Sequence, residues 1–149
     1  MTTPTAGRIE AIWIKPGHRQ PMKDVLRARL LVDRGLEGNA HQGGRRQVTV
    51  LDAGQWDAVQ GEIGAPVDPR SRRANLFVRG LDLRDSRGKV LKIGATRLAV
   101  GGETRPCRLM DDAQPGLCRA LDPEWRGGIF GRVVDGGEIA VGDEVTWEP

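Results

Sequence analysis

The sequence is poor in several kinds of residue, and each shortage excludes a class of protein. Its 149 residues include no tyrosine and only two cysteines, and aromatic residues make up 4% of the chain. Two cysteines cannot build the disulfide framework of a small secreted domain, so we expect both thiols to be reduced. No apolar run approaches the roughly 20 residues of a membrane-spanning helix. The N-terminus also lacks the pattern of a signal peptide, and we therefore expect a cytoplasmic protein with no membrane segment.

An excess of charge of one sign is also missing. The chain has 23 basic and 20 acidic residues, which gives a net charge of +3 and an isoelectric point near 9.3. Nineteen of the basic residues are arginine, whose planar guanidinium suits contacts with phosphate and carboxylate. A genomic codon bias explains the same excess, and charge alone favours that explanation. No basic run exceeds two residues, so we expect no nucleic-acid partner.

The residue that is abundant is glycine, with 21 copies spread along the chain. Glycine at this spacing is typical of tight turns between many short strands. Periodicity and turn residues predict strands over 8–14, 25–33, 47–51, 75–79, 89–93 and 96–100. Residues 131–134, 138–141 and 144–147 are predicted to form a C-terminal β-meander, because Asp-Gly between apolar runs favours a hairpin.

Helices are predicted in two places. Residues 53–63 carry apolar residues at helical spacing, with Asp52 as N-cap and Gly64 as C-cap. A short helix or two is predicted within 106–121, interrupted at Pro115-Gly116. The fold class is therefore mainly β with a few helices (α+β), a β-barrel of seven or more short strands. We expect a single domain over 1–149, with its core at about 8–147.

Cys107 is the first candidate for chemistry. It lies in the segment Glu103-Thr104-Arg105-Pro106-Cys107-Arg108, where Pro106 suits the first turn of a helix. The positive end of that helix, together with Arg105 and Arg108, would favour the thiolate, which is a nucleophile and a soft metal ligand. The alternative is that Cys107 is a small buried apolar residue. For Cys118, between Leu117 and Leu121, the buried alternative is preferred.

Other candidates lie in loops. His41 belongs to the glycine-rich stretch 35–44 and would suit a general acid or hydrogen-bond donor, although an ordinary loop histidine is the simpler interpretation. Arg45 and Arg46 follow Gly43-Gly44, a pattern common at phosphate sites. Similar pairings of arginine with small or polar residues occur at 72–75 and 126–128. Any single one of these arginines can equally be a solvated surface residue, and no spacing typical of a zinc site is present.

Taken in order, several stretches make the chain resemble the MOSC domain, named for the C-terminal region of molybdenum cofactor sulfurases. The matching stretches are Gly-Leu-Glu-Gly-Asn-Ala-His (35–41), Arg-Gln-Val-Thr-Val-Leu (46–51), Arg-Arg-Ala-Asn-Leu-Phe-Val-Arg-Gly (72–80), Lys-Ile-Gly (92–94), Arg-Pro-Cys-Arg-Leu-Met (105–110), Arg-Gly-Gly (126–128) and Gly-Gly-Glu-Ile-Ala-Val-Gly-Asp (136–143). The resemblance implies a β-barrel of the MOSC or pyruvate-kinase-barrel type. One residue departs from the family pattern, because Asn39 stands where the family usually has aspartate.

The resemblance also implies functional residues. Cys107 corresponds to the family's cysteine, which is proposed to ligate molybdenum or to carry sulfur. Arg46, Arg73, Asn75 and Arg126 fall where the family pattern is strongest, and we assign them, with Arg45 and Arg105, to binding the molybdenum–pterin cofactor. Sulfurases carry a pyridoxal-phosphate domain before the MOSC region, and we expect no pyridoxal phosphate here.

Three functions remain open at this point. The first is a molybdenum-dependent oxidoreductase that reduces N-hydroxylated compounds with electrons from a partner reductase. The second is a non-catalytic carrier in which Cys107 holds a persulfide from a sulfur donor. The third is an anion-binding or interaction domain with a buried, unreactive Cys107.

Overall fold

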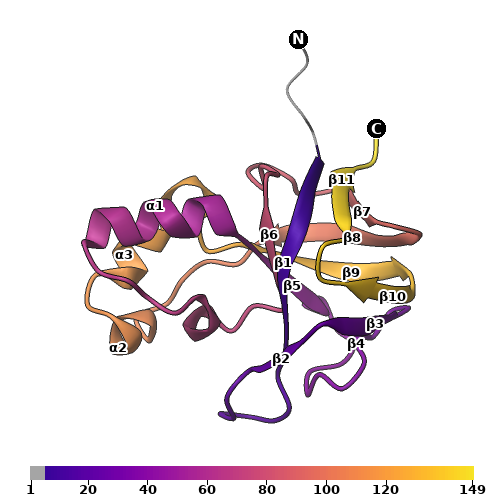
Figure 1. Cartoon of the computed structure of the whole chain (residues 1–149), viewed down its shortest axis with the longest axis horizontal. Helices are drawn as coiled ribbons and strands as arrows, with labels where there is room; N and C mark the ends of the chain where they lie inside the picture. The colour runs from indigo at the N-terminus through magenta and orange to yellow at the C-terminus, as the bar shows by residue number, and fades with distance from the viewer. Residues whose placement is uncertain (1–5) are drawn as a thin grey trace.

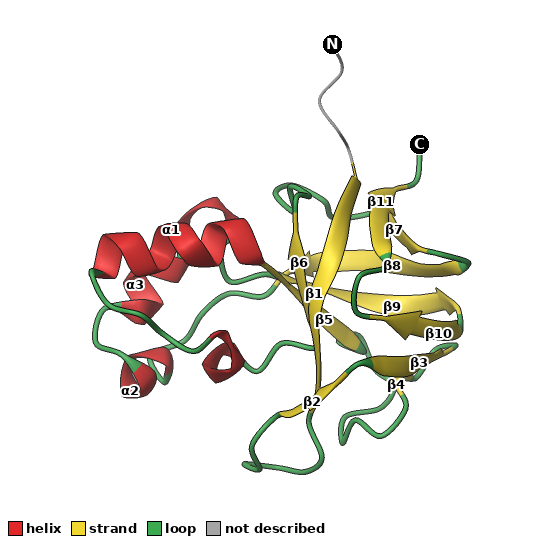
Figure 2. Ribbon diagram, in the orientation of Figure 1, coloured by secondary structure: helices red, strands yellow, loops and turns green. Residues whose placement is uncertain are grey.

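In the computed structural model, which describes residues 6–149, seven strands close into a barrel and the helices gather against one side of it (Figures 1 and 2). Around the barrel the strands are β1 (Ala6–Ile14), β6 (Leu76–Arg79), β5 (Val48–Asp52), β9 (Ile129–Asp135), β8 (Thr96–Glu103), β7 (Val90–Ile93) and β11 (Glu144–Trp147). Strand β1 pairs with β6 and also with β11, and the second pairing closes the barrel. The mainly-β barrel predicted from the sequence is confirmed.

A small second sheet corrects the predicted meander. It consists of β10 (Gly137–Ala140), β3 (Arg27–Leu31) and β4 (Gly35–Leu36). Strand β10 therefore pairs with β3 and not with β9, and β11 pairs with β1 and β7. The hairpin prediction was wrong because β8 and β5 already occupy the two edges of β9.

The predicted strand over 25–33 is interrupted. Strand β2 (Lys23–Val25) pairs with β1 on the barrel, whereas β3 belongs to the small sheet. Between them lies Leu26, which is 78% exposed. The chain changes sheet at this residue, so a single continuous strand cannot form.

Helix α1 (Ala53–Ile63) has the bounds predicted from the sequence. The side chain of Asp52 accepts a hydrogen bond from the backbone N–H of Gln55, and Gly64 ends the helix with a φ of 75°. After α1 the short 3₁₀ helix η1 (Pro69–Arg72) leads into β6, which runs parallel to β5. This β–α–β crossover brings η1 to the start of β6, where the candidate site lies.

The predicted helical region over 106–121 forms two short helices. Helix α2 (Met110–Ala113) and helix α3 (Leu117–Leu121) are separated at Pro115-Gly116 as expected, and η2 (Pro123–Trp125) follows. Helix α2 begins at Met110, later than the sequence suggested. None of the helices within residues 6–149 has the length and apolar character required to cross a membrane.

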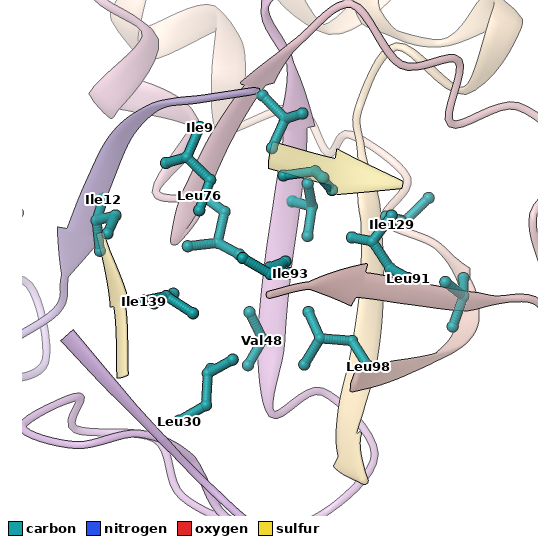
Figure 3. Close-up of a cluster of buried hydrophobic side chains, with 14 of the residues drawn as sticks. Ile9, Ile12, Leu30, Val48, Leu76, Leu91, Ile93, Leu98, Ile129 and Ile139 are labelled. Atoms are coloured by element: carbon teal, nitrogen blue, oxygen red, sulfur yellow. The ribbon is translucent and has the colours of Figure 1, made fainter. Parts of the chain in front are cut away.

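Two hydrophobic cores lie on opposite faces of the shared strands. The first fills the barrel with residues such as Ile9, Val48 and Leu76 (Figure 3). The second lies between the barrel wall and the helices, and it includes Trp56 of α1 and Phe77 of β6. Alternation along the strands explains the division, because successive side chains point to opposite faces of the sheet.

Candidate functional site

A cavity of about 200 Å³ opens where four separate segments meet. The segments are the end of β1, the glycine-rich loop after β4, strand β5, and the junction of η1 with β6. The loops after β1 and β4 extend from the same end of the barrel (Figure 1). We call this cavity the arginine pocket; its lining residues are Lys15, Asn39, His41, Arg46, Thr49, Arg73 and Asn75.

Buried amides form the floor of the arginine pocket. The Oδ1 atom of Asn75 accepts hydrogen bonds from the backbone N–H of Thr49 at 3.1 Å and from its hydroxyl at 3.3 Å. The Nδ2 atom of Asn75 donates to the Trp13 carbonyl at 3.1 Å and to Oδ1 of Asn39 at 3.2 Å. These bonds tie β1, β5, β6 and the glycine-rich loop together, so Asn75 is a structural organiser of the pocket.

Asn39 connects this floor to the loop. Its Oδ1 also accepts from the backbone N–H of Lys15 at 2.8 Å, and its Nδ2 donates to the carbonyl of His41 at 3.2 Å. A carboxylate in its place could accept the first bond but could not donate the second. The amide therefore suits the surrounding loop and adds no negative charge to the pocket.

Arg73 has a buried guanidinium nitrogen without a hydrogen-bond partner among residues 6–149. It ends η1 in the left-handed conformation, with a φ of 61°, which directs the chain into β6. The buried nitrogen is Nη2. A buried guanidinium nitrogen without an acceptor is unfavourable unless a ligand supplies one.

No carboxylate lines the arginine pocket, which instead gathers Lys15, Arg46 and Arg73. The guanidinium of Arg46 lies over the ring of Phe130, with its carbon 5.1 Å from the ring centroid. Stacking on a ring holds a guanidinium without using its N–H donors. The donor set therefore fits a ligand that carries an anionic group such as phosphate.

Arg72 binds backbone carbonyls and does not line the arginine pocket. The sequence did not distinguish this structural role from that of Arg73. The Nε of Arg72 donates to the Gly127 carbonyl at 3.0 Å and its Nη2 donates to the Thr104 carbonyl at 2.9 Å. Burial lowers the pKa of Arg72. Arg72 thus anchors the segment that carries Cys107 to the element that carries Arg73.

Cys107 is exposed to solvent on the loop between β8 and α2. The predicted position at a helix N-terminus was wrong, since α2 begins three residues later and the Cys107 carbonyl accepts a hydrogen bond from the Met110 N–H at 3.0 Å. Cys107 is not among the residues that line the arginine pocket. Cys118, by contrast, is half-buried at the start of α3.

Two other predicted cofactor residues lie outside the arginine pocket. Arg126 donates from Nε to Gln55 at 3.0 Å and from Nη1 to Glu62 at 2.5 Å, and it lines a separate cavity of about 410 Å³ among the helices. Arg105 is paired with Asp122 at 3.3 Å, and its side chain is 72% exposed. The structure therefore brings together His41, Arg46, Arg73 and Asn75, but not Arg105 or Arg126.

Arg45 lies beside the arginine pocket rather than in it. Its guanidinium carbon is 5.8 Å from the centroid of the Phe130 ring, which it shares with Arg46. Lys15 and Thr49 line the pocket but were not predicted. Lys15 directly follows a predicted strand, and this position at a strand end is the signal that could have indicated it.

Comparison with known proteins agrees with this architecture. A structure of the YuaD protein of Bacillus subtilis superposes with a TM-score of 0.82 at 21% identity, covering 95% of each chain. YiiM of Geobacillus stearothermophilus gives a TM-score of 0.78 at 16% identity, covering 96% of this chain and 75% of that one. YiiM of Escherichia coli gives 0.72 at 15% identity, with 95% and 70% covered. At these identities the likeness establishes the fold alone.

At the level of sequence, no curated protein matches the chain. The family profile of the MOSC domain, however, matches residues 37–146, which is most of the chain. That range includes the glycine-rich loop, Arg46, Arg73 and Cys107, so both the barrel and the arginine pocket lie largely within it. The chain belongs to the MOSC domain family.

Proposed function

We propose that this protein binds the molybdenum–pterin cofactor, with the arginine pocket holding the cofactor's phosphate and Cys107 supplying a thiolate ligand to the metal. The observation that carries the proposal is that Lys15, Arg46 and Arg73 meet in a pocket without carboxylates, while the buried Nη2 atom of Arg73 has no hydrogen-bond partner among residues 6–149. Arg46 and Lys15 would complete the set of donors. Membership of the MOSC family supports the choice of this cofactor over other phosphorylated ligands.

Cys107 fits the proposed role as a metal ligand through its accessibility and softness. Its side chain is exposed, so a metal could bind there without a rearrangement of the core, and thiolates are preferred ligands of soft metal centres. Arg72 donates to the Thr104 carbonyl and directly precedes Arg73, so it connects the segment that carries Cys107 with the arginine pocket. The cofactor, when bound, would supply two-electron redox chemistry.

With that cofactor, the activity we infer is reduction of an N-hydroxylated compound in the cytoplasm. The hydroxylamine R–NH–OH would take up two electrons and two protons to give R–NH₂ and water, and a partner reductase would supply the electrons. In this proposal His41, which is exposed and lines the arginine pocket, would donate a proton.

Production of the protein in a molybdenum-replete host tests the proposal. We expect wild type to contain molybdenum together with pterin fluorescence after denaturation. Arg73→Met should lose both signals, and Cys107→Ala should lose or strongly reduce the molybdenum. Cys118→Ala is the matched control and should retain both. The absence of molybdenum and pterin from wild type, or equal amounts in Cys107→Ala, would contradict the proposal.

A second function is favoured by one specific observation, the exposure of Cys107 on a surface loop. A sulfur carrier needs a thiol that a donor protein can approach. The Cys107 thiolate would attack the outer sulfur of a donor persulfide R–S–SH, forming Cys107–S–SH and releasing the thiolate R–S⁻. Mass spectrometry after incubation with a persulfide donor should show one added sulfur atom in wild type and in Cys118→Ala. An equal gain in Cys107→Ala would exclude this function.

A further inference from the structure

A second basic cavity lies next to the arginine pocket. Its volume is about 300 Å³, and it is lined by Gly44, Arg45, Phe130, Arg132 and the backbone region 99–101. No acidic residue lines it. The carboxylate that comes nearest to Arg132 among those described is that of Asp33, at 3.9 Å with both side chains more than half exposed, and such a pair contributes little.

Two contacts place this cavity beside the arginine pocket. Arg46 lines the arginine pocket and Arg45 lines the second cavity, and both guanidinium groups lie over the same Phe130 ring. On the loop, Nε2 of His41 lies 3.9 Å from the position that a Cβ on Gly44 would occupy. The two cavities are therefore connected by the turn at 41–46, with Arg46 of the arginine pocket over the Phe130 ring that lines the second cavity.

The packing of Phe130 leaves the donors of both arginines available. The ring packs closely against Gly101, where an added Cβ would lie 2.5 Å from a ring carbon. Arg45 and Arg46 have no hydrogen bond or ion pair with any other described side chain, in contrast to Arg97, which is held by Asp135 and Glu148. Phe130 thus positions two guanidinium groups whose N–H donors have no acceptor within residues 6–149.

We propose that the cavity of Gly44, Arg45 and Arg132 is a second anion subsite, so that the natural ligand carries two separated anionic groups linked as in a phosphoanhydride chain. One group would occupy the arginine pocket, and the next would lie against Arg45 and Arg132. The backbone N–H groups near Gly44, whose φ is +72°, would add donors of the kind seen in phosphate-binding turns. The inference rests on the proposed anion-binding role of the arginine pocket and extends it to a nucleotide or other organic diphosphate.

Calorimetric titration with orthophosphate and with tripolyphosphate tests the second subsite. In wild type we expect tripolyphosphate to bind at least tenfold more tightly than orthophosphate. The variant Arg45→Gln/Arg132→Gln should reduce that ratio to about twofold and leave orthophosphate affinity within twofold of wild type. Arg119 lines the separate cavity among the helices, so Arg119→Gln is the control for loss of a positive charge. It should leave the ratio of tripolyphosphate to orthophosphate affinity unchanged.

The outcomes separate this inference from the proposed function. The second subsite would be overturned if the ratio of tripolyphosphate to orthophosphate affinity were unchanged in Arg45→Gln/Arg132→Gln. It would also be overturned if this ratio fell equally in Arg119→Gln. If Arg73→Gln instead left orthophosphate affinity intact while Arg45→Gln/Arg132→Gln abolished the preference for tripolyphosphate, the arginine pocket would lose its proposed role and the second subsite would stand.

Discussion

At the scale of single residues, Asn39 sets the charge of the arginine pocket. Its amide oxygen accepts from Lys15 and Asn75, and its nitrogen donates to the His41 carbonyl. The family's usual aspartate would add a negative charge among Lys15, Arg46 and Arg73. The protein instead keeps a pocket whose charged lining residues are all basic.

Asn39→Asp should weaken orthophosphate binding by about tenfold or more, because two like charges about 6–10 Å apart repel by about 2–3 kcal/mol at an effective dielectric of about 20. The carboxylate would also lose the bond to the His41 carbonyl. Titration calorimetry at neutral pH measures the effect. Gln114→Glu adds the same charge between α2 and α3 and should change the affinity less than twofold. Equal affinities of Asn39→Asp and wild type would show that the anion does not bind beside Asn39.

At the scale of elements, the caps of α1 were predictable from the sequence, whereas strand partners were not. Asp52 and Gly64 act within a few residues of the helix ends, so local sequence suffices to place them. The partner of β10 depends on which strands of the whole barrel still have an unpaired edge, and the local sequence around β10 does not indicate this. The start of α2 was misplaced for a similar reason, because Thr104 and Arg72 hold the preceding segment in an irregular loop.

In the candidate site too, some features could be predicted from the sequence and others depend on the whole fold. The proximity of Arg46, Arg73 and Asn75 followed from the family resemblance, and the structure places all three in one pocket. The Arg-Gly-Gly segment at 126–128 is placed elsewhere by backbone packing: a Cβ on Gly127 would come within 2.2 Å of the Thr104 carbonyl. Sequence cannot distinguish a glycine needed for close packing from one needed for an anion.

Asp52 provides a test of the α1 cap with a defined pH dependence. Burial raises the pKa of Asp52 above the ordinary value of 3.8, so the folded protein retains this proton to higher pH than the unfolded chain. Stability therefore falls as the pH rises from about 3.8 through the folded pKa. Asn keeps the cap without a charge, so at neutral pH Asp52→Asn should be at least as stable as wild type, whereas Asp52→Ala should lose about 1 kcal/mol.

Urea unfolding at pH 7 and below pH 4 measures both variants. The advantage of Asp52→Asn over wild type should shrink at the acidic pH, where wild-type Asp52 is protonated in both states. A growing advantage at low pH would show that the raised pKa is assigned to Asp52 incorrectly.

Gly128 tests the packing role of the Arg-Gly-Gly segment. Its φ is +102°, and an added Cβ would lie 2.4 Å from the Val50 carbonyl oxygen, so Gly128→Ala should destabilise the protein by about 2 kcal/mol or more through clash and strain. Gly61→Ala in α1, where no atom lies within 4 Å, should instead stabilise it by about 0.5–1 kcal/mol. Chemical denaturation measures both changes. An equal response of the two variants would contradict the close packing at Gly128.

At the scale of the whole molecule, the two hydrophobic cores share the strands β5 and β6. Leu76 points into the barrel, whereas the adjacent Phe77 packs in the core between barrel and helices. Because β5 and β6 contribute side chains to both cores, loss of packing in one core should disturb the other. Trp13 and Trp56 lie in the helix-side core, and Trp125 and Trp147 pack against the barrel core, so tryptophan fluorescence reports on both.

We therefore expect a single cooperative unfolding transition. Leu76→Ala, which removes a fully buried side chain, should lower the free energy of unfolding by about 2–5 kcal/mol. It should shift the fluorescence and far-UV circular dichroism curves together. Separate transitions by the two probes, with only one moved by Leu76→Ala, would show that the cores unfold independently.

The central claim is that the arginine pocket binds an anion through the guanidinium of Arg73, whose Nη2 has no hydrogen-bond partner among residues 6–149. Titration of the isotope-labelled protein with orthophosphate, followed by backbone amide NMR, tests it most directly. Saturable shift changes should concentrate in residues 39–46, at Thr49 and over 73–75, and should disappear in Arg73→Met. Changes centred on the cavity of Arg119 and Arg126, or changes equally strong in Arg73→Met, would contradict the claim.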